Sequence, residues 1–427
     1  MLKGFCHKRL ERDLDRWIAA GWVPPDSRAL ILEDATEGGG VGFAALLGIL
    51  GAVLFSAGVL TFVAANWEAM SRLSRVGLLA GGLWAALLAG AWLKQAGHAW
   101  LARAAWLIAM AIYGGSIMLV SQMYHIHGNF PDGMMLWALG ALFAAALLGS
   151  QVVLAAAIAL LAFWDWSVLS QHLEPQPHWG FVIPWAVALG LALWRRQPWA
   201  VNLAVLAGFM WAVPNLGLWW AGRFNDRTIT GSMVQISTAG FICGVLTAAG
   251  GWPRAALLAR PLRLYGGLGM LGGFFLLQVV SSSGLRPGAF MVSSWGLAGM
   301  AALLALLAVA WLRGRLRLPD VLVLGGAATW GLAAWYPPLA GFSLHVLAAV
   351  VVLVLAVWMI AFGRRGQAVG LYWGGFAAFA AEVLYLYFET LGSLLDTSVF
   401  MLLGGVLFIA LGWGLVWLAR RGRGRAA

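Results

Sequence analysis

The sequence contains very little charge for its length. Only 10% of its 427 residues are charged and 62% are hydrophobic, whereas a soluble domain is about 25% charged and 45–50% apolar. One soluble core cannot hide this apolar excess, because too few polar residues remain to coat its surface. The composition therefore excludes an ordinary soluble domain and predicts an integral membrane protein whose solvent is largely lipid.

Cysteine and the familiar catalytic motifs are also scarce. Cys6 lies in the N-terminal tail and Cys243 lies inside an apolar run, so neither a disulfide framework nor a thiolate metal site is expected. The sequence has no H-E-x-x-H, G-x-S-x-G, P-loop or haem-attachment motif. These absences argue against the common membrane enzymes and leave an unfamiliar one open, and we expect no cofactor.

The net charge of +11 does not indicate a nucleic-acid-binding protein. The basic residues fall in short gaps between apolar runs or at the termini, rather than on one soluble face. This distribution is typical of residues that set membrane topology. We therefore expect a lipid bilayer as the main partner and no nucleic acid.

Apolar runs, most of them near the ~20 residues that cross a bilayer, follow one another from Val41 onward. They predict an all-α polytopic bundle of about 14 transmembrane helices. The helices expected at 134–148 and 152–168 form either a tight hairpin or one broken segment, because only three residues separate them. The predicted spans are 41–65, 76–93, 104–122, 134–148, 152–168, 181–194, 199–220, 232–249, 264–280, 294–312, 319–335, 344–362, 369–388 and 399–418.

The basic residues also predict an orientation. With the N-terminus inside, most of the 27 lysines and arginines fall in the cytoplasmic segments, including the cluster at 420–425. This satisfies the positive-inside rule and places both termini in the cytoplasm of a bacterial cell, with the chain in the inner membrane. Twelve helices remain an alternative, which would require two neighbouring spans to be lost together.

Three regions are expected. Residues 1–40 predict a cytoplasmic amphipathic helical hairpin, because Leu14, Trp17 and Ile18 share one helical face and Pro24-Pro25 interrupt it. This hairpin either packs on the membrane face or docks a partner. Residues 41–170 hold the first membrane helices, and residues 171–427 hold the remaining helices and the basic tail.

Polar residues in the apolar runs converge on the outer half of the predicted bundle. Asp165, Glu382, Tyr385 and His345 all map there, together with prolines at 184 and 214. Ionisable groups at membrane depth are costly unless they face a bundle interior or a wet cavity. These four residues therefore predict an outward-facing polar cavity, lined by helices that we expect to be interrupted at the two prolines.

Histidines gather in the predicted outward loops as well. With nearby carboxylates they could bind a transition metal, but no ligand spacing here is diagnostic. We interpret them as polar loop residues and predict no metal site. They are His125, His127, His172 and His178.

Two short motifs carry a resemblance to a known family. The first predicted span ends in Ala64-Ala65-Asn66-Trp67, and a basic pair, Arg72 and Arg75, follows; the third ends in Ser121-Gln122-Met123-Tyr124-His125. With the amphipathic hairpin before them, these residues resemble the bacterial predicted-membrane-protein family called domain of unknown function 2157, over about the first 170 residues. The resemblance implies no established activity. It implies a signature at the outer face, namely Asn66, Trp67, Gln122, Tyr124 and His125, and a membrane-associated protein partner there.

Three functions stay open. The leading hypothesis is a transporter-like protein whose outer cavity carries Asp165 and Glu382, because about fourteen spans exceed what an anchor needs. The alternative is a non-catalytic assembly or envelope-maintenance component that docks a partner at the outer face. A third is a lipid- or glycan-modifying enzyme, although the sequence leans away from an enzyme.

Overall fold

The structure is a computed structural model, and it describes residues 13–28, 69–126, 128–171, 176–221, 226–248, 254–282, 294–333, 342–366 and 368–390. The chain divides into two compact parts, Met1–Leu78 and Leu79–Ala427, and each is described by itself. One helix, α4 (Arg72–Gln95), begins in the first part and ends in the second.

The described segment of the first part is an amphipathic helix followed by a turn. Residues 13–19 are helical, with Leu14 fully buried while its neighbours Asp15 and Arg16 are exposed. The helix ends at Gly21, whose φ of 73° is a left-handed conformation that glycine adopts without strain. Pro24-Pro25 then turn the chain before helical backbone resumes at residue 27. The predicted apolar stripe and the predicted stop both lie here.

The second part is all helical where the structure describes it. Twelve of the fourteen predicted spans coincide with helices, and the other two, 41–65 and 399–418, lie outside the described residues. After α4 the elements are α5 (Ala99–Met123), α6 (Phe130–Leu148), α7 (Gln151–Gln171), the short 3-10 helix η1 (Trp179–Phe181), α8 (Val182–Trp194), α9 (Pro198–Ala221), α10 (Asp226–Ala248), α11 (Ala255–Ser282), α12 (Ser294–Leu312), α13 (Leu318–Ala333), α14 (Phe342–Arg365) and α15 (Val369–Thr390).

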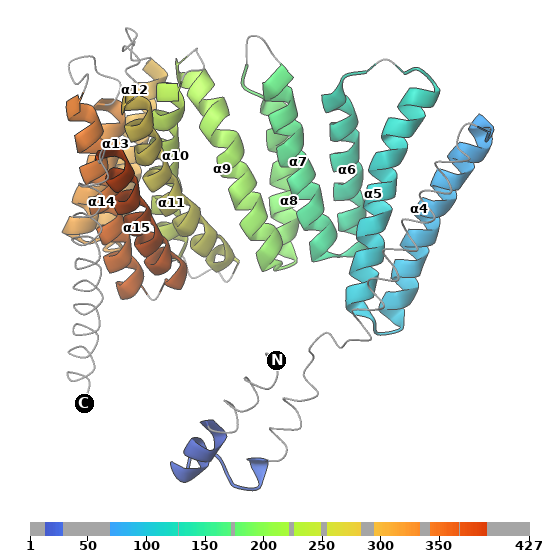
Figure 1. Ribbon diagram of the computed structural model, residues 1–427, viewed down its shortest axis with the longest axis horizontal. Coiled ribbons are helices and arrows are strands. Elements are labelled where there is room, and N and C mark those ends of the chain that lie inside the picture. The colour runs from blue at the N-terminus through green and yellow to red at the C-terminus, as the bar shows by residue number, and fades with distance from the viewer. Residues whose placement is uncertain are drawn as a thin grey trace. The chain divides into compact units, whose positions relative to one another are not determined.

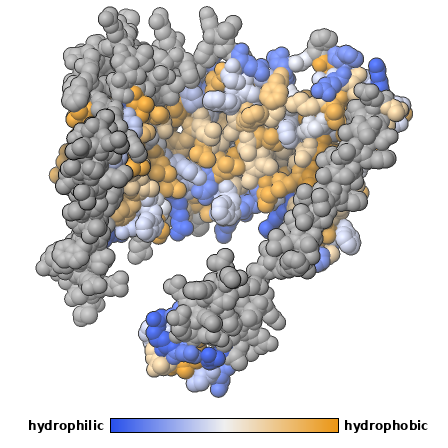
Figure 2. All heavy atoms as spheres, in the orientation of Figure 1, coloured by the Kyte–Doolittle hydropathy of each residue, from blue (hydrophilic) through white to orange (hydrophobic). Residues whose placement is uncertain are grey.

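These helices have the length and composition of membrane spans. Within the described residues, nine are long and apolar enough to cross a bilayer, and three more are shorter apolar helices. Figure 2 shows an apolar band over the middle of the coloured helices, with hydrophilic side chains gathered at its two margins. The predicted all-α membrane fold is therefore confirmed at the level of its helices.

The helices of the second part form two groups with separate apolar cores. One core is built from α5 to α9, and the other from α10 to α15. Helix α9 connects the two groups, since it packs against α7 and α8 on one side and against α10 and α11 on the other. Figure 1 shows α5 to α9 following one another across the view, with α10 to α15 gathered beyond α9.

Successive helices run in opposite directions, so their connections fall at two ends (Figure 1). We call one the basic end, because it holds the arginine-rich turns between α8 and α9, α12 and α13, and α14 and α15. An ion pair links two of these turns, with Arg365 at the end of α14 bound to Asp320 at the start of α13. The other end, with the connections from α5 to α6 and from α7 to α8, is the distal end.

The turn between α6 and α7 resolves an ambiguity of the sequence. Helix α6 ends at Gly149, whose φ is 68°, and α7 begins two residues later. A Cβ at Gly149 would also lie 2.8 Å from Nη1 of Arg195. The pair is therefore a tight hairpin rather than one broken segment, and the turn requires glycine.

Glycines allow the close packing of α10 against α11. A Cβ at Gly266 would lie 2.6 Å from the backbone nitrogen of Phe241, and one at Gly244 would lie 2.8 Å from the backbone nitrogen of Arg263. Only glycine lets two helix backbones approach this closely, as in small-xxx-small contacts between membrane helices.

The prolines do not interrupt their helices, contrary to the prediction. Pro214 lies inside the continuous helix α9, and Pro184 lies in the first turn of α8, where a missing N–H costs little. Near Pro214, the Asn215 amide donates to the Trp211 carbonyl and the Ser232 hydroxyl of α10 donates to the Val213 carbonyl. The carbonyl that Pro214 leaves without its helical N–H is that of Met210, so these bonds hold the turns around the proline and do not replace the missing bond.

Candidate functional site at the distal end

A buried carboxylate–histidine pair lies at the distal end of the first helix group. Asp165, in the last third of α7, is only 4% exposed. Its Oδ1 lies 2.9 Å from Nδ1 of His178, the residue that precedes η1. The predicted cavity residue Asp165 therefore meets one of the histidines that the sequence places in an outward loop.

Asn215 of α9 holds this pair in place. Its Oδ1 accepts a 2.5 Å hydrogen bond from the His178 backbone N–H, and its Nδ2 lies 3.5 Å from Oδ2 of Asp165. The indole of Trp211, one turn earlier on α9, donates to the His178 carbonyl over 2.9 Å. The side chain and both backbone groups of His178 are thus fixed by residues of α7 and α9. We call these three residues the Asp165–His178–Asn215 cluster.

Aromatic side chains enclose the cluster. The Trp164 and His178 rings meet edge to face with centroids 4.6 Å apart, and the Trp179 and Trp211 rings meet at 5.5 Å. Phe181 of η1 stacks on Trp211 at 6.0 Å. This apolar surround removes water from the carboxylate, which makes its hydrogen bonds to His178 and Asn215 more important than they would be at a surface.

The arrangement can hold and exchange a proton. A carboxylate can only accept hydrogen bonds, so Nδ1 of His178 carries a proton whenever Asp165 is ionised. The second ring nitrogen, Nε2, makes no hydrogen bond within the described residues, and a Cβ at Gly180 would lie 3.1 Å from it. The His178 side chain is 13% exposed against 5% for Asp165. The imidazole therefore connects the buried carboxylate to less buried surroundings.

The other predicted cavity residues lie in the second helix group. Glu382 of α15 is 1% exposed, and the Tyr385 ring one turn later packs edge to face on Phe275 of α11, with centroids 4.9 Å apart. Helix α15 packs on α11 and α14, whereas α7 packs on α5, α6, α8 and α9. The structure does not bring Glu382 into the Asp165–His178–Asn215 cluster. His345 is in α14, but its side chain lies outside the described residues.

The third predicted span ends in a tightly bonded cap. His125 has a φ of 53°, and the Ile126 N–H donates to the Ser121 carbonyl at the end of α5. The Ser121 hydroxyl donates in return to the Ile126 carbonyl over 3.2 Å. This is a Schellman-type cap with histidine where glycine is usual. Gln122, Tyr124 and His125 are all exposed around it.

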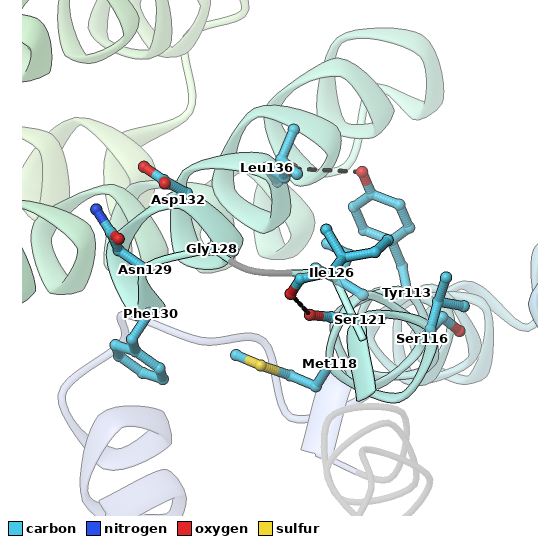
Figure 3. A pocket seen from close by; sticks show the side chains of 13 residues that line it. Tyr113, Ser116, Met118, Ser121, Ile126, Gly128, Asn129, Phe130, Asp132 and Leu136 are labelled. Atoms are coloured by element: carbon cyan, nitrogen blue, oxygen red, sulfur yellow. Dashed lines mark hydrogen bonds between the residues drawn. The ribbon is translucent and has the colours of Figure 1, made fainter. Parts of the chain in front are cut away.

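A cavity of 490 Å³ lies between this cap and α6. Figure 3 shows Tyr113, whose hydroxyl donates to the Leu136 carbonyl, and Met118 reaching toward Phe130. Asp132 lines it too, but most of its lining is apolar, and Asp165 is not part of it. The cavity is thus separate from the buried cluster.

Comparison with known proteins finds a similarity in the first third of the chain. Residues 15–154 match the family model of DUF2157, described as a predicted membrane protein. The match confirms the resemblance seen in the sequence. No curated protein and no solved structure matches the chain.

The DUF2157 match bears differently on the two features. It includes α4, α5, α6 and the start of α7, and hence the cap with Gln122, Tyr124 and His125. The Asp165–His178–Asn215 cluster lies beyond its end at residue 154. The two other residues of the signature, Asn66 and Trp67, fall outside the described residues.

The sequence did not predict that Asp165, His178 and Asn215 contact one another, although the predictions included Asp165 and His178 separately. His178 is one of the four predicted loop histidines, and Asn215 directly follows Pro214, where a helix interruption is predicted. Their positions in the sequence could have indicated the contact, because Asp165 and His178 flank one short connection between antiparallel helices. No group of three His, Cys, Asp or Glu side chains suited to a metal occurs within the described residues. His127, His172 and Glu174 lie outside them.

Asn215→Ala is expected to destabilise the protein by ~1–3 kcal/mol, because it leaves buried polar groups of His178 and Asp165 without partners. Asn202→Ala is the matched control. Asn202 is on the same helix and its amide also donates to the carbonyl four residues earlier, but it holds no buried pair. Its cost should stay below about 0.5 kcal/mol. Thermal unfolding in detergent measures both, and equal losses would contradict a special role for Asn215.

Proposed function

We propose that this protein is a transporter-like inner-membrane protein in which the Asp165–His178 pair takes up and releases a proton. The observation that carries the proposal is a buried carboxylate, on a membrane-length helix, bonded to a histidine whose other nitrogen has no described partner. Ionisable residues at membrane depth are expensive and mark ion or proton pathways in pumps and transporters.

The chemistry of the Asp165–His178 pair suits proton exchange better than a purely structural role. A histidine that donates from one ring nitrogen to a carboxylate can take up and release a proton at its other ring nitrogen. Proton uptake at Nε2 makes an imidazolium that Asp165 stabilises, and proton loss leaves a neutral imidazole that still donates from Nδ1. Asn215 can hold the Asp165 and His178 side chains in place whether the imidazole is protonated or neutral, since its contacts go to the His178 backbone and to Oδ2 of Asp165.

The orientation that we propose has the basic end in the cytoplasm. Within the described residues the basic end carries most of the arginines, and the positive-inside rule favours such an end in the cytoplasm. Under this orientation, with fourteen spans and both termini inside, the distal end faces outward. The Asp165–His178–Asn215 cluster would then be reached from the outer side.

A second candidate function is docking of a membrane-associated partner at the distal end. The supporting observation is the α5 cap, where Gln122, Tyr124 and His125 are exposed on backbone fixed by the two hydrogen bonds between Ser121 and Ile126. Exposed side chains on a preorganised backbone lose little entropy on binding.

Proton coupling is tested in liposomes that hold the purified protein and a pH-sensitive dye. We expect proton uptake in the presence of at least one member of a broad substrate panel, and Asp165→Asn should reduce it to background. Asp132→Asn, an exposed aspartate at the same end, is the control and should keep wild-type flux. The absence of flux for the wild type across the panel, or equal flux for Asp165→Asn, would refute the proposal.

Cysteine labelling tests the orientation. In a chain with Cys6→Ser and Cys243→Ala, Asn129→Cys at the distal end should react with an impermeant maleimide on intact cells. Arg315→Cys at the basic end should react only after lysis. A chain that keeps only Cys6 should also require lysis if the N-terminus is inside. The opposite pattern would reverse the proposed topology.

Docking at the cap is tested by purification of the tagged chain in mild detergent. The double variant Tyr124→Ala/His125→Gly removes two exposed side chains, yet glycine suits the backbone at residue 125, so the fold should persist. We expect this variant to lose a stoichiometric partner that Gln95→Ala, at the basic end, retains. A partner that stays bound to the double variant docks elsewhere.

A further inference from the structure

A cleft lined by cations lies at the basic end of the first helix group. Its volume is 320 Å³, and it lies between the turns that join α4 to α5, α6 to α7 and α8 to α9. Four basic side chains line it, namely Lys94, Arg103, Arg195 and Arg196. No Asp or Glu is among the described residues that line it. We call it the basic cleft.

Hydrogen bonds to the protein account for only one of the four cations. The Arg195 guanidinium donates to the carbonyls of Ala145 and Ala146, so it caps the C-terminal end of α6. Lys94 lies over the Trp106 ring at 5.5 Å, and neither Arg103 nor Arg196 pairs with a described carboxylate. Cations of one sign around one small volume repel each other, and an anion between them removes that cost.

Arg196 is held there against its backbone preference. Its φ is 53°, and the Gln197 N–H donates to the Ala192 carbonyl, which makes Arg196 the left-handed residue of a helix cap. Three other turns at the basic end have glycine in this conformation: Gly97, Gly149 and Gly314. Arginine costs more than glycine at such a position. Arg196 lines the cleft, and its cationic side chain is what glycine would not supply.

The surroundings of the cleft are those of a lipid headgroup. Exposed tryptophans accompany its cations along the chain, and tryptophan prefers the headgroup level of a bilayer. They are Trp92, Trp100, Trp194 and Trp199. Gln197, which also lines the cleft, is 8% exposed, and its Oε1 is buried without a hydrogen-bond partner within the described residues. This oxygen can accept a hydrogen bond from an O–H or N–H donor, and a hydroxyl of a headgroup is one such donor.

We propose that the basic cleft binds the headgroup of an anionic, hydroxyl-bearing phospholipid of the phosphatidylglycerol class. Lys94, Arg103 and Arg196 would bind the phosphate, and Gln197 Oε1 would accept from a headgroup hydroxyl. The volume equals about ten water molecules, which suffices for such a headgroup. Basic pockets between membrane helices bind anionic headgroups in this way. The site is independent of the proton-exchanging cluster at the distal end.

The experiment uses the full chain in neutral detergent, with thermal unfolding followed during titration by phosphatidylglycerol, phosphatidylcholine or inorganic phosphate. We expect stabilisation by phosphatidylglycerol alone. The double variant Arg103→Gln/Arg196→Gly should weaken the apparent affinity about thirtyfold, or about fivefold for each cation removed. Without lipid it should be at least as stable as the Arg103→Gln variant, because glycine relieves the backbone at 196.

The control variant Arg313→Gln/Arg315→Gln removes two exposed arginines of another turn at the basic end, and it should keep wild-type affinity. Three outcomes would overturn the proposal. If the Arg103→Gln/Arg196→Gly variant kept wild-type affinity for phosphatidylglycerol, the lipid would not bind in the cleft. If the control variant lost as much affinity, the lipid would bind through general surface charge. Equal stabilisation by inorganic phosphate would assign the cleft to a soluble anion instead.

Discussion

The bilayer offers no water to the backbone, and the rest of this structure depends on that constraint. Every N–H and C=O at membrane depth needs a partner within the protein, and a helix supplies one for nearly all of them. Left-handed and irregular backbone therefore occurs where helices end, as at Gly149 and Arg196. Around Pro214, inside the continuous helix α9, the side chains of Asn215 and Ser232 donate to the Trp211 and Val213 carbonyls.

Buried carboxylates also need partners within the protein. The kind of partner separates a carboxylate with a structural role from one that is a candidate for function. Asp320 accepts hydrogen bonds from the Trp358 indole, the Arg365 guanidinium and a backbone N–H. Arginine stays charged at every working pH, so this ion pair is a permanent brace between α13 and α14. Asp165 is buried to a similar degree but is paired with His178, which can gain or lose a proton. The partner, rather than the burial, makes Asp165 the candidate for exchange.

The sequence predicted what depends on local composition and missed what depends on loop conformation. The lengths of the apolar runs give twelve helices to within a few residues, except that α10 and α11 begin earlier than predicted. Asp165 stood out because charge is rare at that depth. Its contact with His178 could not be predicted, because it depends on the path of the chain between α7 and η1. The predicted break at Pro214 was wrong because one lost hydrogen bond does not end a helix that packs on α7, α8, α10 and α11.

Strained backbone occurs at both the distal end and the basic end of the helices. Among the described residues, only His125 and Arg196 have a positive φ without being glycine. Each occupies the left-handed position of a helix cap, where comparable turns use glycine, and a residue with a Cβ there costs roughly 1 kcal/mol. Such a cost persists where the side chain provides something that glycine cannot. At His125 this is an exposed ring in the DUF2157 region, and at Arg196 it is a cation in the basic cleft. At each end, therefore, the strained residue lies in the surface for which we propose a recognition role.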